Sequence, residues 1–269
     1  MPIASCRFRS VIPRLRPTRL GVPRTCEVPV ACCPLPRSRN SRKFAAIIMK
    51  LAILANEEQK KEWLSKPTQG DAQLIWVPNH QQLKETKADA YFDLLFQSEK
   101  NHLELLLLLE SPVFINEVIY DFDFLLNAKN EKPAAPILRL NAWPTFLQRE
   151  IVELTIFRKE DEVHAQNIFS ALAWKFKLVP DVAGLISARI IAMIINEAYF
   201  TLQEEVSTKK EIDIAMKLGT NYPHGPFEWS ELIGMHNIYR LLLEMSREDQ
   251  KYQPAELLKK ETEQLAAWH

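Results

Sequence analysis

The sequence of 269 residues holds 34 acidic and six histidine side chains, the usual groups for proton transfer in enzymes. Glu153 lies within the alternating apolar run 150–157, where it either acts in acid–base chemistry or points into solvent. His80 and His102 are interpreted as isolated, and no set of His, Asp and Glu has the spacing of metal ligands. The residues by themselves therefore predict no metal site and leave both roles of Glu153 open.

Sulfur chemistry and serine nucleophiles are not expected in the folded part of the chain. No GxSxG motif is present. All the cysteines precede Met49, at Cys6, Cys26, Cys32 and Cys33. The chain after Met49 therefore relies on neither a disulfide nor a thiolate metal site.

Charge is distributed unevenly along the chain. Residues 1–48 hold ten basic side chains against the single acid Glu27, a net charge of +9, while the whole chain has a formal charge of zero. Residues 49–269 therefore carry −9. An acidic body is poorly suited to the phosphate backbone of DNA or RNA, so no nucleic-acid partner is predicted.

The first 48 residues are expected to lie outside the folded unit. Their Arg-rich, acid-poor composition is typical of an organelle transit peptide, but seven of the 17 prolines fall here and would interrupt the amphipathic helix of such a peptide. We interpret residues 1–48 as a disordered extension or a start-site artefact, with the functional chain beginning at Met49. No run of about 18 apolar residues follows, so we expect a cytoplasmic protein without a membrane span.

Short apolar runs alternate with helical patterns between residues 49 and 157. A helix is expected at 56–65, with Asn56 as its N-cap, and another at 99–109. This alternation predicts a doubly wound α/β sheet. The expected strands are 50–55, 73–77, 90–96, 113–119, 137–140 and 150–157.

The chain from residue 160 onward is predicted to be mainly helical. A helix at 160–176 leads to a short strand at 177–179 and then to a long apolar stretch, 180–205, whose polar residues Arg189, Asn196 and Gln203 form one narrow stripe. Three further signals are a capping box at Thr208 with a helix stop at Gly219, a first-turn Pro226, and a helix end at Gly234. The last expected helices are 237–246 and 254–268.

The motifs of this helical half carry a family resemblance. They are Asp181-Val-Ala-Gly-Leu-Ile-Ser-Ala-Arg189, Asn196-Glu-Ala198, Ile212-Asp-Ile-Ala-Met-Lys-Leu-Gly219 and Tyr222-Pro-His-Gly-Pro-Phe-Glu228. Their order and spacing resemble the C-terminal domain of the 3-hydroxyacyl-CoA dehydrogenases. The resemblance implies a shortened Rossmann-like α/β domain at 49–157 and an all-α, 6-phosphogluconate-dehydrogenase-like domain at 160–269, which pairs two subunits into a homodimer.

The resemblance also implies a function and a set of site residues. The family uses NAD to oxidise 3-hydroxyacyl-CoA to 3-ketoacyl-CoA in fatty-acid metabolism, with a His base oriented by a Glu. On this chain the Glu falls on Glu153 and the His position on Asn141, while Ala188, Tyr222 and Phe227 fall near the acyl pocket. The expected ligands are therefore NAD and an acyl-CoA-type molecule.

Two features of the sequence depart from that family pattern. The turn after the first strand, residues 55–59, contains no glycine and places Glu57 and Glu58 where the NAD pyrophosphate would lie. Asn141 cannot take up a proton at neutral pH, so it does not replace a histidine base. Two hypotheses follow: an NAD-dependent dehydrogenase, or a non-catalytic dimer that binds an acyl group or a protein partner.

Overall fold

The computed structural model describes residues 48–66, 70–97, 102–127 and 133–267. The interpretation of residues 1–47 lies outside these described residues. Residues 46–269 form one unit by their internal contacts, so the division between 157 and 160 stays a prediction. No helix in the described ranges is both long and apolar enough to cross a lipid bilayer.

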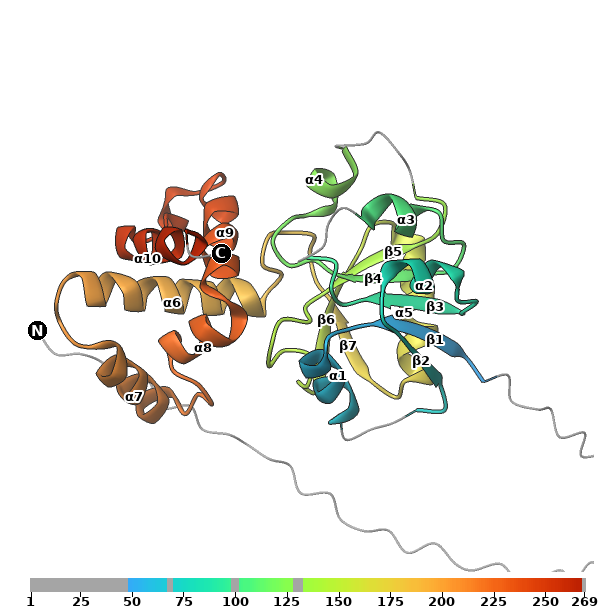
Figure 1. Ribbon diagram of the computed structural model, residues 1–269, viewed down its shortest axis with the longest axis horizontal. Helices are drawn as coiled ribbons and strands as arrows, with labels where there is room; N and C mark the ends of the chain where they lie inside the picture. Colours follow the sequence, from blue (N-terminus) through green and yellow to red (C-terminus); the bar gives the residue numbers. More distant parts are fainter. Residues whose placement is uncertain (1–47, 67–69, 98–101, 128–132, 268–269) are drawn as a thin grey trace, which may run out of the picture. The chain divides into compact units, whose positions relative to one another are not determined.

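The first half of the unit is a seven-stranded sheet with helices on both faces (Figure 1). The strands lie in the order β2-β1-β3-β4-β5-β6-β7. Strands β1 to β5 are parallel, β6 runs antiparallel to β5, and β7 is parallel to β6. The strands are β1 Lys50–Leu54, β2 Gln73–Val77, β3 Ala90–Asp93, β4 Val113–Asn116, β5 Ile137–Leu140, β6 Ile151–Ile156 and β7 Lys175–Leu178.

Both faces of the sheet are buried, which explains why its central strands read as continuous apolar runs. Leu51 and Ile53 point to one face, and Ala52 and Leu54 point to the other. The first face packs on α1 (Glu57–Leu64) and α5 (Glu162–Ala171). The second packs on α2 (His80–Glu85), α3 (Leu103–Leu107) and α4 (Phe122–Asn127).

Two strands are shorter than predicted. Acidic side chains at or just after their ends accept hydrogen bonds from the backbone amides that follow. Strand β3 ends at Asp93, whose Oδ1 accepts from the amide of Leu95 at 3.1 Å. After β4, the Glu117 carboxylate accepts from the amides of Ile119 and Tyr120, at 2.8 and 3.0 Å. These bonds replace the ladder bonds of a strand, so the chain turns away from the sheet.

Local signals misplaced several helices of this half. The sequence prediction missed α2 and α4, each only six residues long. The helix predicted at 160–176 ends at Ala171, and the strand predicted at 177–179 is β7, beginning at Lys175. Ala173 takes a positive φ of 54°, which stops the helix early.

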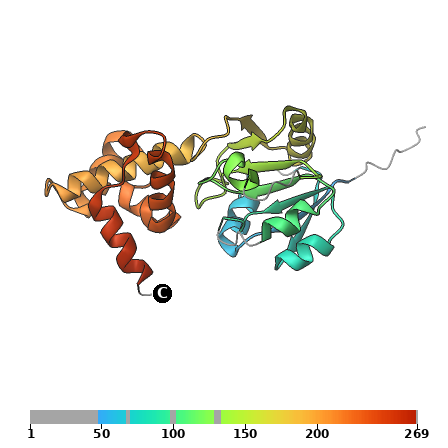
Figure 2. The same ribbon diagram turned by 90° about the horizontal axis from the view of Figure 1, so that it is seen from above.

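The second half is a group of helices that pack on one another (Figure 2). They are α6 Ser187–Gln203, α7 Lys209–Thr220, α8 Pro226–Ile233, α9 Met235–Ser246 and α10 Glu256–Ala266. Their shared core surrounds α6 and includes Ile195, Tyr199, Phe227 and Leu241. Together with the sheet, these helices confirm the predicted fold class, an α/β half followed by an all-α half.

The capping signals of this half were read correctly, with one exception. The Thr208 capping box, Pro226 in a first turn and Gly234 with a φ of 91° are all present. Helix α7, however, runs past Gly219 to Thr220, and its C-cap Asn221 takes a left-handed φ of 55°. Asparagine is the residue after glycine that best tolerates this conformation, so a glycine was not needed there.

The polar stripe on α6 faces the C-terminal segment. Asn196 donates to the carbonyl of Gln253 at 2.9 Å and accepts from the amide of Ala255 at 2.8 Å. Gln203 accepts from the amide of Leu257 at 3.1 Å. The seven-residue spacing thus places two amide side chains against the backbone that leads into α10.

Candidate functional site

Strand order singles out one place in the sheet as a crevice for ligands. The chain passes from β1 to β2 on one side and later returns to β3 on the other, so the strand order reverses beside β1. In such sheets, ligands bind at the carboxyl ends of the strands at this switch point. The structure has a cavity of about 200 Å³ there, lined by Asn56, Gln59, Leu94 and Gln97 among other residues.

The turn between β1 and α1 caps itself. Asn56 accepts from the amide of Gln59 at 2.8 Å, and the Gln59 side chain accepts from the amide of Asn56 at 3.1 Å. Glu57 and Glu58 occupy the first turn of α1. The chain's own oxygens therefore occupy the helix N-terminus, where dinucleotide-binding folds place a phosphate.

Two side-chain amides cross-link the loops after β3 and β5. The Gln59 Nε2 group donates to the carbonyls of Leu94 and Ala142, at 2.8 and 3.3 Å. Asn116, at the end of β4, donates to the same Leu94 carbonyl at 3.0 Å and accepts from the amide of Ala142 at 2.9 Å. Both side chains are buried, so they fill the carboxyl edge of the sheet with internal hydrogen bonds.

A third amide extends this network into the helical half. Gln97 Oε1 accepts from the indole of Trp143 at 2.9 Å and from the amide of Val118 at 3.2 Å. Its Nε2 group donates to Asn237 at 3.0 Å, and Asn237 in turn donates to the carbonyl of Ile233 at 2.9 Å. We call Gln59, Gln97, Asn116 and Asn237 the amide network.

Glu153 caps a helix. Its carboxylate accepts from the amide of Ser187 at 3.0 Å, from the Ser187 hydroxyl at 2.5 Å and from the amide of Ile186 at 3.3 Å. These donors lie at the start of α6, where a negative charge also interacts favourably with the helix dipole. This capping role differs from both roles that the sequence left open for Glu153, catalysis and exposure to solvent.

Asn141, at the expected histidine position, is not bonded to Glu153. It is 3% exposed, and its Oδ1 accepts from the amide of Trp143 at 3.1 Å. Its Nδ2 has no hydrogen-bond partner among the described residues. The two residues that the resemblance assigns to catalysis therefore make separate contacts.

The three residues expected at the acyl pocket lie in different surroundings. Ala188 and Phe227 are buried in the helical core, with exposures of 0% and 4%. Tyr222 is partly exposed and lines a second cavity, of about 380 Å³. This cavity is also lined by Arg149, Ser187, Ile190, Ile191, Pro223 and Trp229.

His80 and His102 are not isolated, so that interpretation was wrong. Their rings stack with centroids 3.9 Å apart, and His80 Nε2 lies 2.8 Å from Asp93 Oδ2. His80 at the start of α2 and Asp93 at the end of β3 are buried, whereas His102, just before α3, is partly buried. Sequence spacing could not reveal it because the three residues meet only after β2 and β3 take their places. Among the described residues, no cluster of three His, Cys, Asp or Glu could hold a metal ion.

The motifs that carry the resemblance have structural roles. Asp181 pairs with the buried Arg139 of β5 and accepts from the amide of Phe122 at 2.9 Å. Burial lowers the pKa of Arg139 and raises that of Asp181, and the opposite charge of each partner counteracts the shift. Asp213 accepts from the amide of Phe227 at 2.8 Å and lies so close to Gly225 that a Cβ atom there would collide with it.

Comparison with known proteins supports the family resemblance that these motifs carry. Residues 184–266 match the model of the 3-hydroxyacyl-CoA dehydrogenase C-terminal domain. The 3-hydroxyadipyl-CoA dehydrogenase of Escherichia coli is 41% identical over 83 residues, which is 30% of this chain and 18% of that protein. The 3-hydroxybutyryl-CoA dehydrogenase of Clostridioides difficile is 38% identical over 116 residues, 41% of each chain. The matched stretches thus span less than half of these relatives.

Solved structures extend the likeness of fold to most of the chain. The (S)-3-hydroxybutyryl-CoA dehydrogenase of Ralstonia eutropha superposes with a TM-score of 0.60 at 16% identity, covering 79% of this chain and 93% of that one. FadB2 of M. tuberculosis gives 0.62 at 14% identity, covering 80% and 94%. At these identities the likeness shows the fold alone. Residues 184–266 are thus similar to the C-terminal domain of the 3-hydroxyacyl-CoA dehydrogenases, and most of the chain shares its fold with solved structures of such enzymes.

Proposed function

We propose that this chain is a dimeric, acyl-group-binding member of the dehydrogenase-like proteins that does not catalyse NAD-dependent oxidation. The observation that carries the proposal is the amide of Gln59, which binds the carbonyls of Leu94 and Ala142 within the crevice at the switch point. The alternative function is the family reaction, oxidation of 3-hydroxyacyl-CoA by NAD. It is favoured by the relatives' names, which describe them as dehydrogenases.

NAD does not fit the residues present in the crevice. Its cavity of about 200 Å³ is smaller than the range of roughly 300–1,000 Å³ for small-molecule and cofactor sites. Asn56 and Gln59 already satisfy the helix N-terminus, and Glu57 and Glu58 would repel a pyrophosphate. Opening the crevice would also require buried hydrogen bonds of Gln59 and Asn116 to break.

No general base is available where the family reaction needs one. The amide of Asn141 does not titrate near neutral pH, unlike the imidazole expected there. Glu153 uses its oxygens on Ser187 and Ile186 at the start of α6. A carboxylate held in this way stabilises the first turn of the helix.

Binding of an acyl group remains compatible with the structure. The relatives are named for 3-hydroxyadipyl-CoA and 3-hydroxybutyryl-CoA, both acyl thioesters. The second cavity, of about 380 Å³, has apolar walls from Ile190, Ile191 and Trp229, and its volume is in the range of small-molecule sites. An acyl-CoA-type ligand is therefore the class we propose for this chain.

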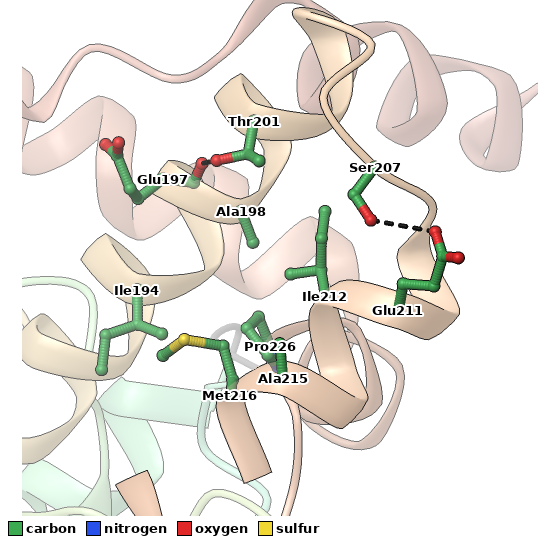
Figure 3. Close-up of a pocket in the computed structure, with 10 residues that line it drawn as sticks. All are labelled: Ile194, Glu197, Ala198, Thr201, Ser207, Glu211, Ile212, Ala215, Met216 and Pro226. Carbon is green, nitrogen blue, oxygen red and sulfur yellow. Dashed lines mark hydrogen bonds between the residues drawn. The ribbon is translucent and has the colours of Figure 1, made fainter. Parts of the chain in front are cut away.

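A groove between α6 and α7 supports the proposal of a homodimer (Figure 3). Its volume is about 400 Å³, and Ile194 and Met216 point toward each other across it. On α7, Leu218 is 82% exposed, which adds apolar surface to the same helix. Apolar surface on adjacent helices is typical of subunit interfaces with twofold symmetry.

A cytoplasmic location stays a prediction of the sequence.

The test is thermal unfolding of the full chain with NAD, NADH or acetoacetyl-CoA. A ligand at 100 times its Kd stabilises a protein by about 2.7 kcal/mol, a shift that is easily measured. We expect a shift with acetoacetyl-CoA and none with either nucleotide. A shift with NAD or NADH would contradict the closed crevice and favour the dehydrogenase, whereas no shift with acetoacetyl-CoA would contradict acyl binding.

A further inference from the structure

Arg149 differs from the other arginines of the described residues. Five of the six donate hydrogen bonds from their guanidinium groups. These are Arg139, Arg158, Arg189, Arg240 and Arg247. Arg149 donates none to a described residue. Its guanidinium carbon lies over the Phe146 ring, 3.9 Å from the ring centroid.

The nearby carboxylates do not serve as acceptors for Arg149. Glu62 accepts from the backbone amides of Thr145 and Gln148, at 2.5 and 3.4 Å. Glu153 accepts from Ser187 at the start of α6. Burial lowers the pKa of Arg149, while the charges of Glu153 and Glu62 counteract that shift. Arg149 is half-buried, and no nitrogen of it is among the buried polar atoms without a partner. Its guanidinium therefore has donors that no described carboxylate uses and that an anion in the second cavity can bind.

This guanidinium lines the second cavity together with apolar walls. Ile190, Ile191, Pro223 and Trp229 supply those walls. The volume of about 380 Å³ equals that of about a dozen water molecules, at roughly 30 Å³ each. This is enough for a carboxylate on a medium-length alkyl chain. The planar fork of a guanidinium matches a carboxylate in two parallel hydrogen bonds.

We propose that the second cavity binds an acyl chain through a free carboxylate held by Arg149. The ligand class is a medium-chain carboxylate, either as a free acid or as the far end of a dicarboxylic acyl thioester. The inference rests on the proposed acyl-binding function and adds its specificity. Arg149 selects the charged end, and the isoleucines bind the alkyl chain.

The experiment is calorimetric titration of the full chain with octanoate and with 1-octanol, which has the same chain length without the charge. We expect octanoate to bind at least about tenfold tighter, because hydrogen bonds to charged groups are the strong ones. Arg149→Met keeps an apolar stem and should abolish this preference without weakening octanol binding. Arg149→Lys should retain part of it, and Arg247→Met, at an exposed arginine, should change nothing.

Each outcome separates this inference from the proposed function. Equal binding of octanoate and octanol by the wild-type chain would overturn the role of Arg149 while leaving acyl binding intact. Persistence of the octanoate preference in Arg149→Met would likewise overturn the role of Arg149 and leave acyl binding intact. Absence of binding by both probes would overturn the cavity as an acyl site altogether. Adipyl-CoA, titrated afterwards against hexanoyl-CoA, distinguishes the thioester from the free acid by which of them shows the Arg149-dependent preference.

Discussion

The side chain of Gln59 donates a hydrogen bond of 2.8 Å to the carbonyl of Leu94, although the two residues are 35 positions apart. One lies in the first helix and the other follows β3, on the two sides of the switch point. In a dinucleotide-binding sheet this space admits a ligand. Here the side chain of Gln59 spans that space and closes it.

Replacing Gln59 should destabilise the fold without creating a nucleotide site. Gln59→Ala removes two buried donors, so the free energy of unfolding should fall by about 1–3 kcal/mol in urea denaturation. Gln166→Ala, at an exposed glutamine of α5, is the matched control and should stay within about 0.5 kcal/mol of wild type. An unchanged stability for Gln59→Ala would mean that the amide network does not hold the crevice closed.

Restoring a histidine should not restore the family reaction. Asn141→His supplies a titratable ring at the expected position, but the amide network still fills the nucleotide crevice. We expect no NADH formation from 3-hydroxybutyryl-CoA, measured by absorbance, for either the variant or the wild type. Turnover by the variant would show that NAD enters and that the missing base is the only defect.

Neutralising Glu153 should weaken the start of α6. Glu153→Gln loses the negative charge that accepts from Ser187, so unfolding should require about 1 kcal/mol less free energy. Glu150→Gln, at an exposed acid that pairs with Lys175 just before the same strand, should leave the unfolding midpoint unchanged. Equal effects of the two substitutions would argue against a cap at Glu153.

Lys66 should make stability rise with pH under alkaline conditions. Burial lowers the pKa of Lys66 from the ordinary 10.5 to about 8. Between these values the unfolded chain binds more protons than the folded one, so raising the pH favours folding. The stability of wild type relative to Lys66→Met should therefore increase from pH 8 toward 10.5. Lys61→Met, at an exposed lysine, should show no such trend, and a flat difference for Lys66→Met would disprove the shift.

A charge in the α6–α7 groove should separate the proposed dimer. Met216→Glu places a carboxylate opposite Ile194 in the groove, so sedimentation should show a lower mass than wild type. Leu108→Glu alters an exposed leucine after α3 and should leave the mass unchanged. A wild-type chain that sediments as a monomer would refute the dimer directly.

The sequence could predict whatever depends on neighbours along the chain. The apolar runs of β1, β2 and β5 and the capping box at Thr208 were correct because strand pattern and helix caps are set within a few residues. Strand ends were less certain because they depend on side chains such as Asp93 and Glu117, which bind the next turn of backbone. The missing glycines after β1 were also visible directly.

Amide side chains near the strand ends are a sequence signal for this crevice. Asn or Gln residues occur at or near the carboxyl ends of β1, β3, β4 and β5. They are Asn56, Gln97, Asn116 and Asn141. Because parallel strands bring these ends to one edge, three of them line the same crevice. Composition alone could not say whether they bind a ligand or one another, since an amide can do both.

Tertiary structure decided the roles of the remaining site residues. Gln59 hydrogen-bonds to Ala142, which is 83 positions away in the sequence, and Glu153 to Ser187, which is 34 positions away. The Arg149 guanidinium has no acceptor among the described residues, and the nearby Glu62 and Glu153 accept from other donors. No local pattern encodes such choices. The sequence by itself determined the strands and the longer helices, though not α2 and α4, together with the absence of a glycine loop after β1 and of a histidine at position 141. Only the packing of distant segments decided which polar groups of the described residues bind one another and which, such as the Asn141 amide nitrogen, do not.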